Sequence, residues 1–346
     1  MSDNKQDGKL GLMTCVTMIA GSMIGSAIFS LSGLTIYQAG PSAVLTWILA
    51  ALIMMGYGLI CAELSTRFPK SGGVFVFPSK ALGKTTEQGK FWGWISTWGY
   101  INANIVAIAF AAIYVGTYLS VGLPVFANMQ IPLAVISVVL ISILNSVKFS
   151  IAGRANTTLV FGMVIAMAIY IAVAFGSGAW DSALLTPFFT QGAGGSTGFL
   201  TVVPTAMVAY GSIVAIAFMV SEVRDPNKNV PRSIFIAMTL VLILYLGIII
   251  ATVGMISAGF LTENPGMQYI PLYAAAFTKL AGIPWISKVI SIAALLALLT
   301  TMLVVMSITA RAVQASAESG VMPAKLAENN KFGVPVYAVI LLAVPS

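Results

Sequence analysis

Gly21-Ser22-Met23-Ile24-Gly25-Ser26-Ala27-Ile28-Phe29 is rich in small residues and lies in the middle of an apolar segment that otherwise predicts a membrane-spanning helix. Lipid offers no hydrogen-bond partners, so a helix breaks at membrane depth only where protein, a wet cavity or a ligand satisfies the freed backbone. Ala209-Tyr210-Gly211-Ser212 divides a second apolar run, residues 200–220, in the same way. Paired breaks in corresponding positions of two halves indicate a binding site between the broken helices.

The composition is that of a protein in a lipid bilayer. Of the 346 residues, 59% are hydrophobic and 8% are charged, whereas a soluble globular protein carries about 25% charged residues. One crossing needs about 20 apolar residues. The segments without Asp, Glu, Lys or Arg that are long enough to cross once or twice include 10–62, 91–147, 233–262 and 289–310. We therefore expect an all-α polytopic membrane protein.

The hydrophobic pattern predicts about eight complete spans and part of a ninth. The complete spans are expected near 11–36, 43–62, 92–120, 131–147, 156–176, 200–221, 233–257 and 285–313. The ninth begins at Val334 and is incomplete at Ser346. Turn residues at 225–229 predict a loop before span seven. The moderately apolar segment 269–280 is expected to form a short helix over the outer vestibule.

The positive charges predict the orientation. When the loops are assigned to alternate sides, all 17 lysines and arginines except Lys279 and Lys288 fall on one side. Positive charge concentrates in cytoplasmic loops, so we expect a cytoplasmic N-terminus in the inner membrane of a bacterial cell. The pI of about 9.4 then reflects topology, and nucleic acid is not an expected partner.

The residue inventory argues against an enzyme. The chain has no histidine and two cysteines, Cys15 and Cys61, and its carboxylates are not clustered. It therefore offers neither a metal-ligand set nor a nucleophile paired with a base. We expect no metal and no cofactor, and both cysteines are interpreted as packing residues.

The positions of the two breaks predict a repeated design. Residues 1–10 are expected to be a cytoplasmic N-terminus and 11–178 a first repeat with spans one to five. An extracellular loop is expected at 179–199, followed by an incomplete second repeat, 200–346, with spans six to eight and the start of span nine. Inverted repeats of this kind are normally weak in sequence. Whether the protein forms a homodimer stays open.

Four ordered motifs complete the description of the chain. They are GSMIGSAIF at 21–29, AELSTRFPKSGG at 62–73, SEVRDP at 221–226 continuing to Val230-Pro231-Arg232, and Arg311-Ala312-Val313 continuing to GVMP at 320–323. Together they resemble the amino acid-polyamine-organocation permeases over residues 11–343. The resemblance implies a LeuT-like fold of 12 spans with discontinuous helices 1 and 6, of which this chain is similar to the first two-thirds.

The breaks predict how a zwitterion is held. Unwinding frees backbone amides at the positive end of a half-helix, which favours a carboxylate, and freed carbonyls accept hydrogen bonds from an ammonium group. The expected carboxylate donors are Gly25, Ser26 and Ala27. The expected ammonium acceptors are Met23, Ile24, Val208, Ala209 and Gly211, with Tyr210, Ser212, Ile213 and Asn104 beside them. The alternative is that the small residues only permit close helix packing.

The residues after Gly211 predict the substrate class. Family members that bind cationic substrates often have a Gly-aromatic-Glu pattern here, whereas this chain has Ser212, Ile213 and Val214. We therefore expect a neutral, zwitterionic amino acid as the small-molecule substrate. Transport of polyamines or other small organic amines is the alternative on the same fold, and a membrane sensor or a channel is the alternative of another class.

The scarcity of ionisable groups inside the spans predicts how transport is coupled to an ion gradient. Some proton-coupled relatives have a lysine in the fifth span, and here Gly162 or Met163 is near that position. Sodium-coupled LeuT-like folds use hydroxyls of the eighth span, and Thr300 and Thr301 are candidates for that ion site. Exchange or facilitated flux is the favoured prediction, and sodium coupling is the alternative.

Charged residues on the cytoplasmic side are candidates for an inner gate: Glu63, Arg67, Glu222, Arg224 and Arg311. The alternative is ordinary solvated loop charge, since surface ion pairs contribute only about 0 to 1 kcal/mol. Tyr210 is interpreted as a thin gate over the substrate or as a packing residue. Asn102 and Asn104 either line the pocket or bond between helices.

Overall fold

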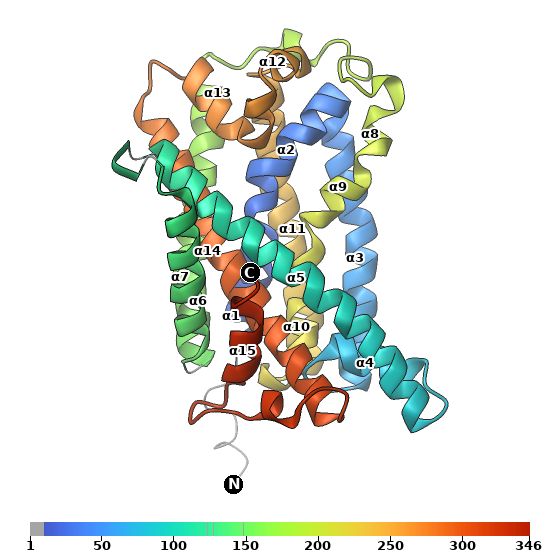
Figure 1. Cartoon of the computed structure of the whole chain (residues 1–346). Helices are drawn as coiled ribbons and strands as arrows, with labels where there is room; N and C mark the ends of the chain where they lie inside the picture. Colours follow the sequence, from blue (N-terminus) through green and yellow to red (C-terminus); the bar gives the residue numbers. More distant parts are fainter. Residues whose placement is uncertain (1–9, 123, 127, 148) are drawn as a thin grey trace.

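The computed structural model describes residues 10–122, 124–126, 128–147 and 149–346, which form a bundle of helices (Figure 1). Over these residues there is no β-strand, and one isolated bridge pairs Leu10 with Val223. The predicted all-α class is confirmed. Most of the expected cytoplasmic N-terminus, residues 1–9, lies outside the described residues.

The helices follow one another with short connections. Their bounds are α1 Leu12–Met23, α2 Ser26–Ala39, α3 Ala43–Arg67, α4 Gly73–Ala81, α5 Thr86–Gly122, α6 Gln130–Asn145, α7 Phe149–Gly176, α8 Gly198–Thr201, α9 Val203–Val208, α10 Ala215–Phe218, α11 Pro226–Val253, α12 Ala258–Glu263, α13 Pro271–Lys279, α14 Trp285–Glu318 and α15 Val336–Ala343.

Both predicted helix breaks are present. The first lies between α1 and α2, and the second lies between α9 and α10, where a 3₁₀ turn spans Gly211–Val214. The helical segments on either side of the second break differ in direction by 41°. Over the described residues, five helices are long and apolar enough to cross a membrane, or six when the bent pair at the second break counts as one crossing. Helices lie at all eight predicted spans, and α15 lies at the start of the predicted ninth.

The lengths of the helices correct several predicted boundaries. α5 has 37 residues and begins at Thr86 rather than at residue 92, so it is about 55 Å long at 1.5 Å per residue. A bilayer core is about 30 Å thick, and Figure 1 shows that α5 slants across the bundle and projects beyond it near α4. α7 also begins earlier than predicted, at Phe149 rather than at residue 156.

The prediction of a loop at 225–229 is wrong. α11 begins at Pro226, because proline suits the first position of a helix, where its missing N–H would have no partner in any case. Asp225 precedes it with φ +44°, a left-handed conformation that aspartate tolerates better than most residues. The helix α4 was not predicted, since it lies in a polar region between spans two and three.

The centre of the bundle is formed by α1 and α14. Residues 15–23 of α1 are all buried, and the helix packs on α7, α11 and α14. α14 in turn packs on α5, α6 and α7. The first broken helix therefore lies inside the protein rather than against lipid.

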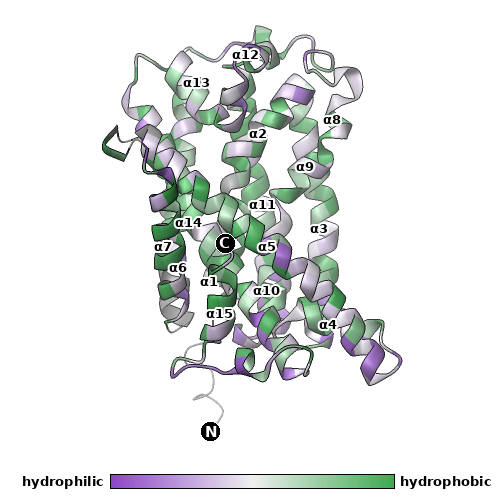
Figure 2. Cartoon of the chain, in the orientation of Figure 1, coloured by the Kyte–Doolittle hydropathy of each residue, from purple (hydrophilic) through white to green (hydrophobic). Residues whose placement is uncertain are grey.

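The two ends of the bundle differ in character. At one end, α12 and α13 cover α2, which confirms the short helix expected at 269–280. The other end carries Arg67, Lys80, Arg224 and Arg311 and is called the basic end below. Figure 2 shows hydrophobic residues along the length of the bundle and hydrophilic residues gathered toward its ends, as expected of a protein that spans a bilayer.

Candidate substrate site at the two helix breaks

The first break is short and completely enclosed. Ile24 donates its N–H to the Ala20 carbonyl at 2.8 Å and closes α1, and Gly25 then turns the chain with φ −39° and ψ −150°. Met23, Ile24 and Ala27 are all buried. The side chain of Ser26 lies outside the described part of the structure. Because the break is inside protein, its backbone groups are shielded from lipid.

Glycine is required at position 25 by a close approach of α14. A Cβ added to Gly25 would overlap the hydroxyl of Thr301 and would lie 2.9 Å from the Thr301 Cβ. Interatomic distances of this kind are not tolerated. The sequence therefore uses glycine here to bring α14 directly against the turn.

The second break is longer and more open. α9 ends at Val208, and the Tyr210 N–H donates to the Met207 carbonyl at 3.0 Å before the 3₁₀ turn begins. The side chain of Val208 is 66% exposed. Gly211 is exposed as well, and a Cβ added there would meet no atom within 4 Å. The side chain of Val208 therefore points out of the bundle. The prediction for this residue concerns its backbone carbonyl and not its side chain.

The remaining predicted residues of the second break are buried on its inner side. Ala209, Tyr210 and Ile213 are each at most 1% exposed, and Ser212 is half-buried. The inner side of this break therefore faces the core of the protein, where the first break also lies. α1 contacts the 3₁₀ turn and α10.

One side chain connects the two breaks. Tyr245 of α11 is fully buried, and its hydroxyl lies 2.5 Å from the Met23 carbonyl oxygen and 3.3 Å from the Ala209 carbonyl oxygen. A phenol has one proton to donate, so two carbonyls at two breaks share a single donor. These two carbonyls were predicted to accept hydrogen bonds from a substrate ammonium group. The structure places them within reach of one common donor.

An aromatic cluster surrounds this hydroxyl. The rings of Trp47 and Tyr245 have centroids 4.9 Å apart, and those of Tyr210 and Tyr245 are 5.2 Å apart. Tyr210 donates its hydroxyl to the Trp47 carbonyl at 3.3 Å. All three side chains are fully buried. Of the two interpretations of Tyr210, this placement favours packing.

The two candidate threonines of α14 lie beside the first break. The Thr300 hydroxyl lies 3.0 Å from the Gly21 carbonyl oxygen and 2.9 Å from the Ala297 carbonyl oxygen. The Thr301 hydroxyl is buried without a hydrogen-bond partner. Buried polar groups rarely lack a partner, so the Thr301 oxygen is the group at this break that is free to coordinate an ion.

Asn156 of α7 is a polar residue that the sequence analysis did not select. Its side chain is fully buried and donates to the Thr17 carbonyl at 3.2 Å, while its Oδ1 has no partner. A Cβ added to Gly21 would lie 3.4 Å from that Oδ1 and also 3.4 Å from the Thr300 Cβ. Asn156 and Thr300 therefore meet at the same turn of α1.

The asparagines of α5 bond to their own helix. The Asn104 amide donates to the Tyr100 carbonyl at 2.8 Å, and the Asn102 amide donates to the Trp98 carbonyl at 2.8 Å. Asn104 is half-buried, whereas Asn102 is exposed. Only Asn104 faces the interior of the bundle.

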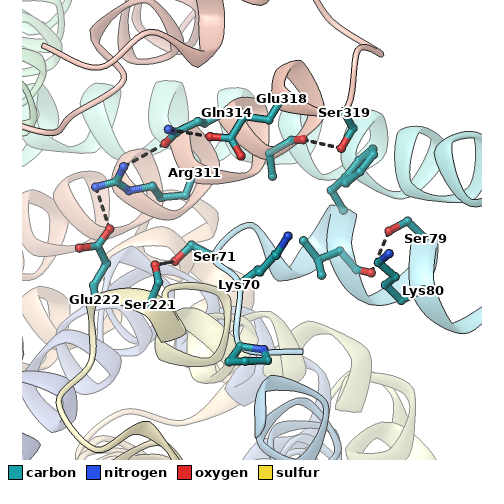
Figure 3. A pocket seen from close by; sticks show the side chains of 14 residues that line it. Lys70, Ser71, Ser79, Lys80, Ser221, Glu222, Arg311, Gln314, Glu318 and Ser319 are labelled. Atoms are coloured by element: carbon teal, nitrogen blue, oxygen red, sulfur yellow. Dashed lines mark hydrogen bonds and ion pairs between the residues drawn. The ribbon is translucent and has the colours of Figure 1, made fainter. Parts of the chain in front are cut away.

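Two elements meet at the basic end through an ion pair. Arg311 of α14 lies 2.9 Å from Glu222, which follows α10, and their side chains are 10% and 27% exposed. Ser71 and Ser221 are hydrogen-bonded beside this pair, and Arg311 also donates to Gln314 at 2.9 Å. Figure 3 shows these groups around a cavity of about 570 Å³. The ion pair therefore joins the segment that follows the second broken helix to α14.

The other candidate gate residues do not join two elements. Glu63 and Arg67 are 2.6 Å apart, but they lie one turn apart on α3 and are 62% and 67% exposed. The side chain of Arg224 is exposed, and no described ion pair contains it. Among the five candidates, only Glu222 and Arg311 therefore form a bridge between separate segments.

Tyr245 is the principal residue that the sequence analysis missed. It is a polar group in α11, whose flanking residues 240–253 are otherwise almost entirely apolar. Because a buried polar group in a membrane span needs a partner, this isolated tyrosine was a usable signal. Its partners could not be identified, since they lie 222 and 36 residues away in the sequence.

The arrangement of helices matches that of a solved transporter. The protein in that structure is a Na⁺-coupled sialic acid symporter in a substrate-bound, outward-open state. The match covers 98% of this chain and 73% of the symporter, with a TM-score of 0.61 and 13% sequence identity. The predicted LeuT-like fold with discontinuous helices 1 and 6 is confirmed.

The chain belongs to the amino acid permease family, whose model matches residues 10–346. This confirms the resemblance to the amino acid-polyamine-organocation superfamily that the motifs indicated. The protein is an integral membrane transporter of amino acids and is not an enzyme. Over the described residues, no group of three or more His, Cys, Asp or Glu side chains could hold a metal.

Three of the relatives that this chain matches are bacterial transporters. The serine/threonine exchanger SteT of Bacillus subtilis is 25% identical over 74% of this chain and 57% of its own length. The branched-chain amino acid permease BcaP of the same species is 26% identical over 92% of this chain and 69% of its own length. An uncharacterized transporter of Mycobacterium tuberculosis is 28% identical over 96% of this chain and 71% of its own length.

Proposed function

We propose that this protein exchanges neutral, zwitterionic amino acids across the inner membrane of a bacterial cell, by alternating access around the two helix breaks. The basic end faces the cytoplasm, as the distribution of positive charge favours. The observation that carries the proposal is the buried meeting of the Met23 and Ala209 carbonyls at one hydroxyl, that of Tyr245. Two acceptors from two broken helices converge there without any charged side chain.

In this proposal the substrate takes the place of internal hydrogen bonds. Its carboxylate is held by the freed amides at Gly25, Ser26 and Ala27, at the positive end of α2. Its ammonium group donates to the carbonyls that Tyr245 bonds in the substrate-free protein. Because an ammonium group has three protons and a phenol has one, the substrate satisfies both breaks at once and draws α1 and the second broken helix together.

The side chains around the breaks support a neutral substrate. Ser212, Ile213 and Val214 occupy the positions where relatives specific for cations carry an acid, and Ile213 and Val214 are buried. A second positive charge on the substrate would therefore be left without a partner, which is costly in a buried site.

Counterflow in proteoliposomes tests the proposal. Vesicles loaded with an unlabelled neutral amino acid should accumulate labelled alanine, serine or leucine without an imposed ion gradient, and uptake should saturate. Arginine, lysine and putrescine should compete weakly. Preferred uptake of any of these cations would overturn the substrate class, and non-saturating flux would indicate a channel.

Sodium coupling is a second candidate, supported by two buried oxygen atoms without partners. The Thr301 hydroxyl and the Asn156 Oδ1 both lie along α1 at the first break. In transporters of this architecture, Na⁺ is coordinated by oxygen atoms beside unwound backbone. Uptake that requires an inward Na⁺ gradient, and that loses this requirement in Thr301→Ala but not in Ser316→Ala, would favour it. Ser316 is a matched control, since its buried hydroxyl donates to its own helix at the Ala312 carbonyl.

A further inference from the structure

The corner between α4 and α5 carries a second polar cavity that transport does not explain. The corner projects from the basic end of the bundle (Figure 1), and the cavity has a volume of about 410 Å³. Lys80, Lys84 and Lys90 line it together with hydroxyl groups of Thr85 and Thr86. No carboxylate side chain lines this cavity in the described structure.

The positive charge of this cavity is only partly balanced. Lys90 pairs with Glu87 at 3.1 Å, and both lie at the start of α5. No described ion pair contains Lys80 or Lys84, and both side chains are exposed. The nearby Glu318 lines the neighbouring cavity and accepts a hydrogen bond from Gln314 at 3.1 Å. Two ammonium groups are therefore available to an anion.

Exposed apolar side chains lie directly beside these lysines. Leu82 is 57% exposed, Phe91 is 56% exposed and Trp92 is 41% exposed. In a membrane protein, exposed apolar groups of this size face lipid, and tryptophan marks the level of the head groups. The lysines at 80, 84 and 90 therefore lie at the depth of lipid phosphates, with a surface for acyl chains beside them.

We propose that this corner binds the phosphate head group of an anionic phospholipid from the adjacent leaflet. The phosphate oxygens accept hydrogen bonds from Lys80 and Lys84, with the Thr85 and Thr86 hydroxyls as further donors. The acyl chains lie along the exposed side of α5. Basic clusters just outside a membrane span recognise anionic lipids in this way.

The site is connected to the ion pair at the basic end. Its cavity shares Ser79, Lys80 and Ser319 with the cavity that contains Arg311 and Glu222 (Figure 3). At the start of α4, the Gly72 N–H donates to the Phe218 carbonyl at 2.8 Å. The Phe77 ring of α4 also packs on the Phe218 ring, with centroids 5.8 Å apart. A lipid held at α4 therefore acts on the end of α10, in the second broken helix.

Lipid binding to the purified full chain tests the proposal. Native mass spectrometry in detergent with added phosphatidylglycerol or phosphatidylcholine compares the parent protein with the double variant Lys80→Gln/Lys84→Gln. We expect phosphatidylglycerol to bind in preference to phosphatidylcholine, and the double variant to bind it about 25-fold more weakly, at roughly fivefold for each lysine.

The chain provides a matched control at the opposite end. Lys279 and Lys288 are also exposed and flank an exposed tryptophan, Trp285, but they do not line this cavity. The variant Lys279→Gln/Lys288→Gln should retain the affinity of the parent. Equal loss in both double variants, or equal binding of the two lipids, would refute the proposal. Displacement of the lipid by millimolar inorganic phosphate would also refute it, because the site would then be one for a free anion.

A folding defect is separated from loss of binding by the melting temperature without lipid. The lysines that are replaced are exposed, so both double variants should melt within a few degrees of the parent. If Lys80→Gln/Lys84→Gln does not fold, the single variant Lys84→Gln is used, and about a fivefold loss of affinity is expected. Unchanged affinity in a folded single variant would count against the site.

Discussion

Both helix breaks interrupt a predicted membrane span, but the residues around them are packed differently. The first is confined to Ile24 and Gly25, is buried, and is pressed against Thr301. The second extends through a 3₁₀ turn, and on one side Gly211 is exposed with free space around it. We therefore predict that the first break is the rigid part of the site and that the second is the part that changes shape.

Packing explains why the two breaks should differ in their tolerance of an added methyl group. A close-packed site cannot absorb an added methyl group, because its neighbours are backbone or short side chains. An open turn has no such neighbours. Tyr245, the residue that connects the two breaks, is anchored in the rigid core by Trp47.

The largest effect is expected for Gly25→Ala. The new Cβ overlaps Thr301, and overpacking of this kind costs about 1 to 3 kcal/mol. We expect a lower melting temperature and substrate binding that is about tenfold weaker or worse, measured by thermal unfolding and equilibrium binding. Adding Thr301→Ala removes the overlapping hydroxyl and should restore part of the stability.

Gly211→Ala is the matched control and should change the unfolding free energy by less than about 0.5 kcal/mol. Equal effects at Gly25 and Gly211 would remove the distinction between the breaks.

Tyr245→Phe should have the next largest effect, because it separates the breaks without changing packing volume. Loss of the hydroxyl leaves two buried carbonyls without their donor, at a cost of about 1 to 3 kcal/mol in the substrate-free protein. Since the substrate ammonium group no longer competes with the phenol, apparent affinity should rise. Calorimetry and thermal unfolding measure the two quantities.

Tyr170→Phe is the control for this variant. The Tyr170 hydroxyl is also buried and lies 2.9 Å from that of Thr252, away from both breaks. Tyr170→Phe should reduce stability by about as much as Tyr245→Phe does, while leaving substrate affinity unchanged. If both tyrosine variants shift affinity alike, Tyr245 has no special relation to the site.

A smaller effect is expected for Arg311→Gln, which releases the segment that follows the second break. The Glu222 side chain is 27% exposed, so water screens the pair and we expect a loss of about 1 kcal/mol, or about a fivefold change in the opening of the basic end. Labelling of Ala217→Cys by a thiol reagent reports that opening, since Ala217 is buried in α10 and both native cysteines, Cys15 and Cys61, are buried as well. The exchange Arg311→Glu/Glu222→Arg should restore the slow labelling of the parent. An equal labelling rate in Arg311→Gln and in the parent would show that the ion pair does not act as a gate.

The smallest effect is expected for Glu63→Gln. This residue pairs within α3 and is exposed, and such pairs contribute about 0.3 to 0.5 kcal/mol. Labelling of Ala217→Cys and transport should both stay within experimental error of the parent. A clear increase in labelling would show that the pair with Arg67 also takes part in closing the basic end.

The predicted spans succeeded where the signal was local. Long apolar runs and the small residues of the two breaks are visible in single segments. Prediction was poorer where polar and apolar residues mix. The hydrophobic pattern does not predict α4, and it places the start of α5 at residue 92 instead of Thr86. It also places Pro226 in a loop, although this residue starts α11. In those regions a helix is stabilised by packing on its neighbours more than by its own composition.

The sequence by itself determined the membrane-spanning class, the helical fold and the positions of both breaks, because composition and helix interruption are properties of neighbouring residues. Only the tertiary structure decided which groups meet there. It placed the Tyr245 hydroxyl between two carbonyls, set Asn156 beside Gly21, and chose Glu222 rather than Glu63 as the partner that joins two segments. These contacts join residues far apart in the chain, so they depend on how the helices pack and not on the sequence around any one of them.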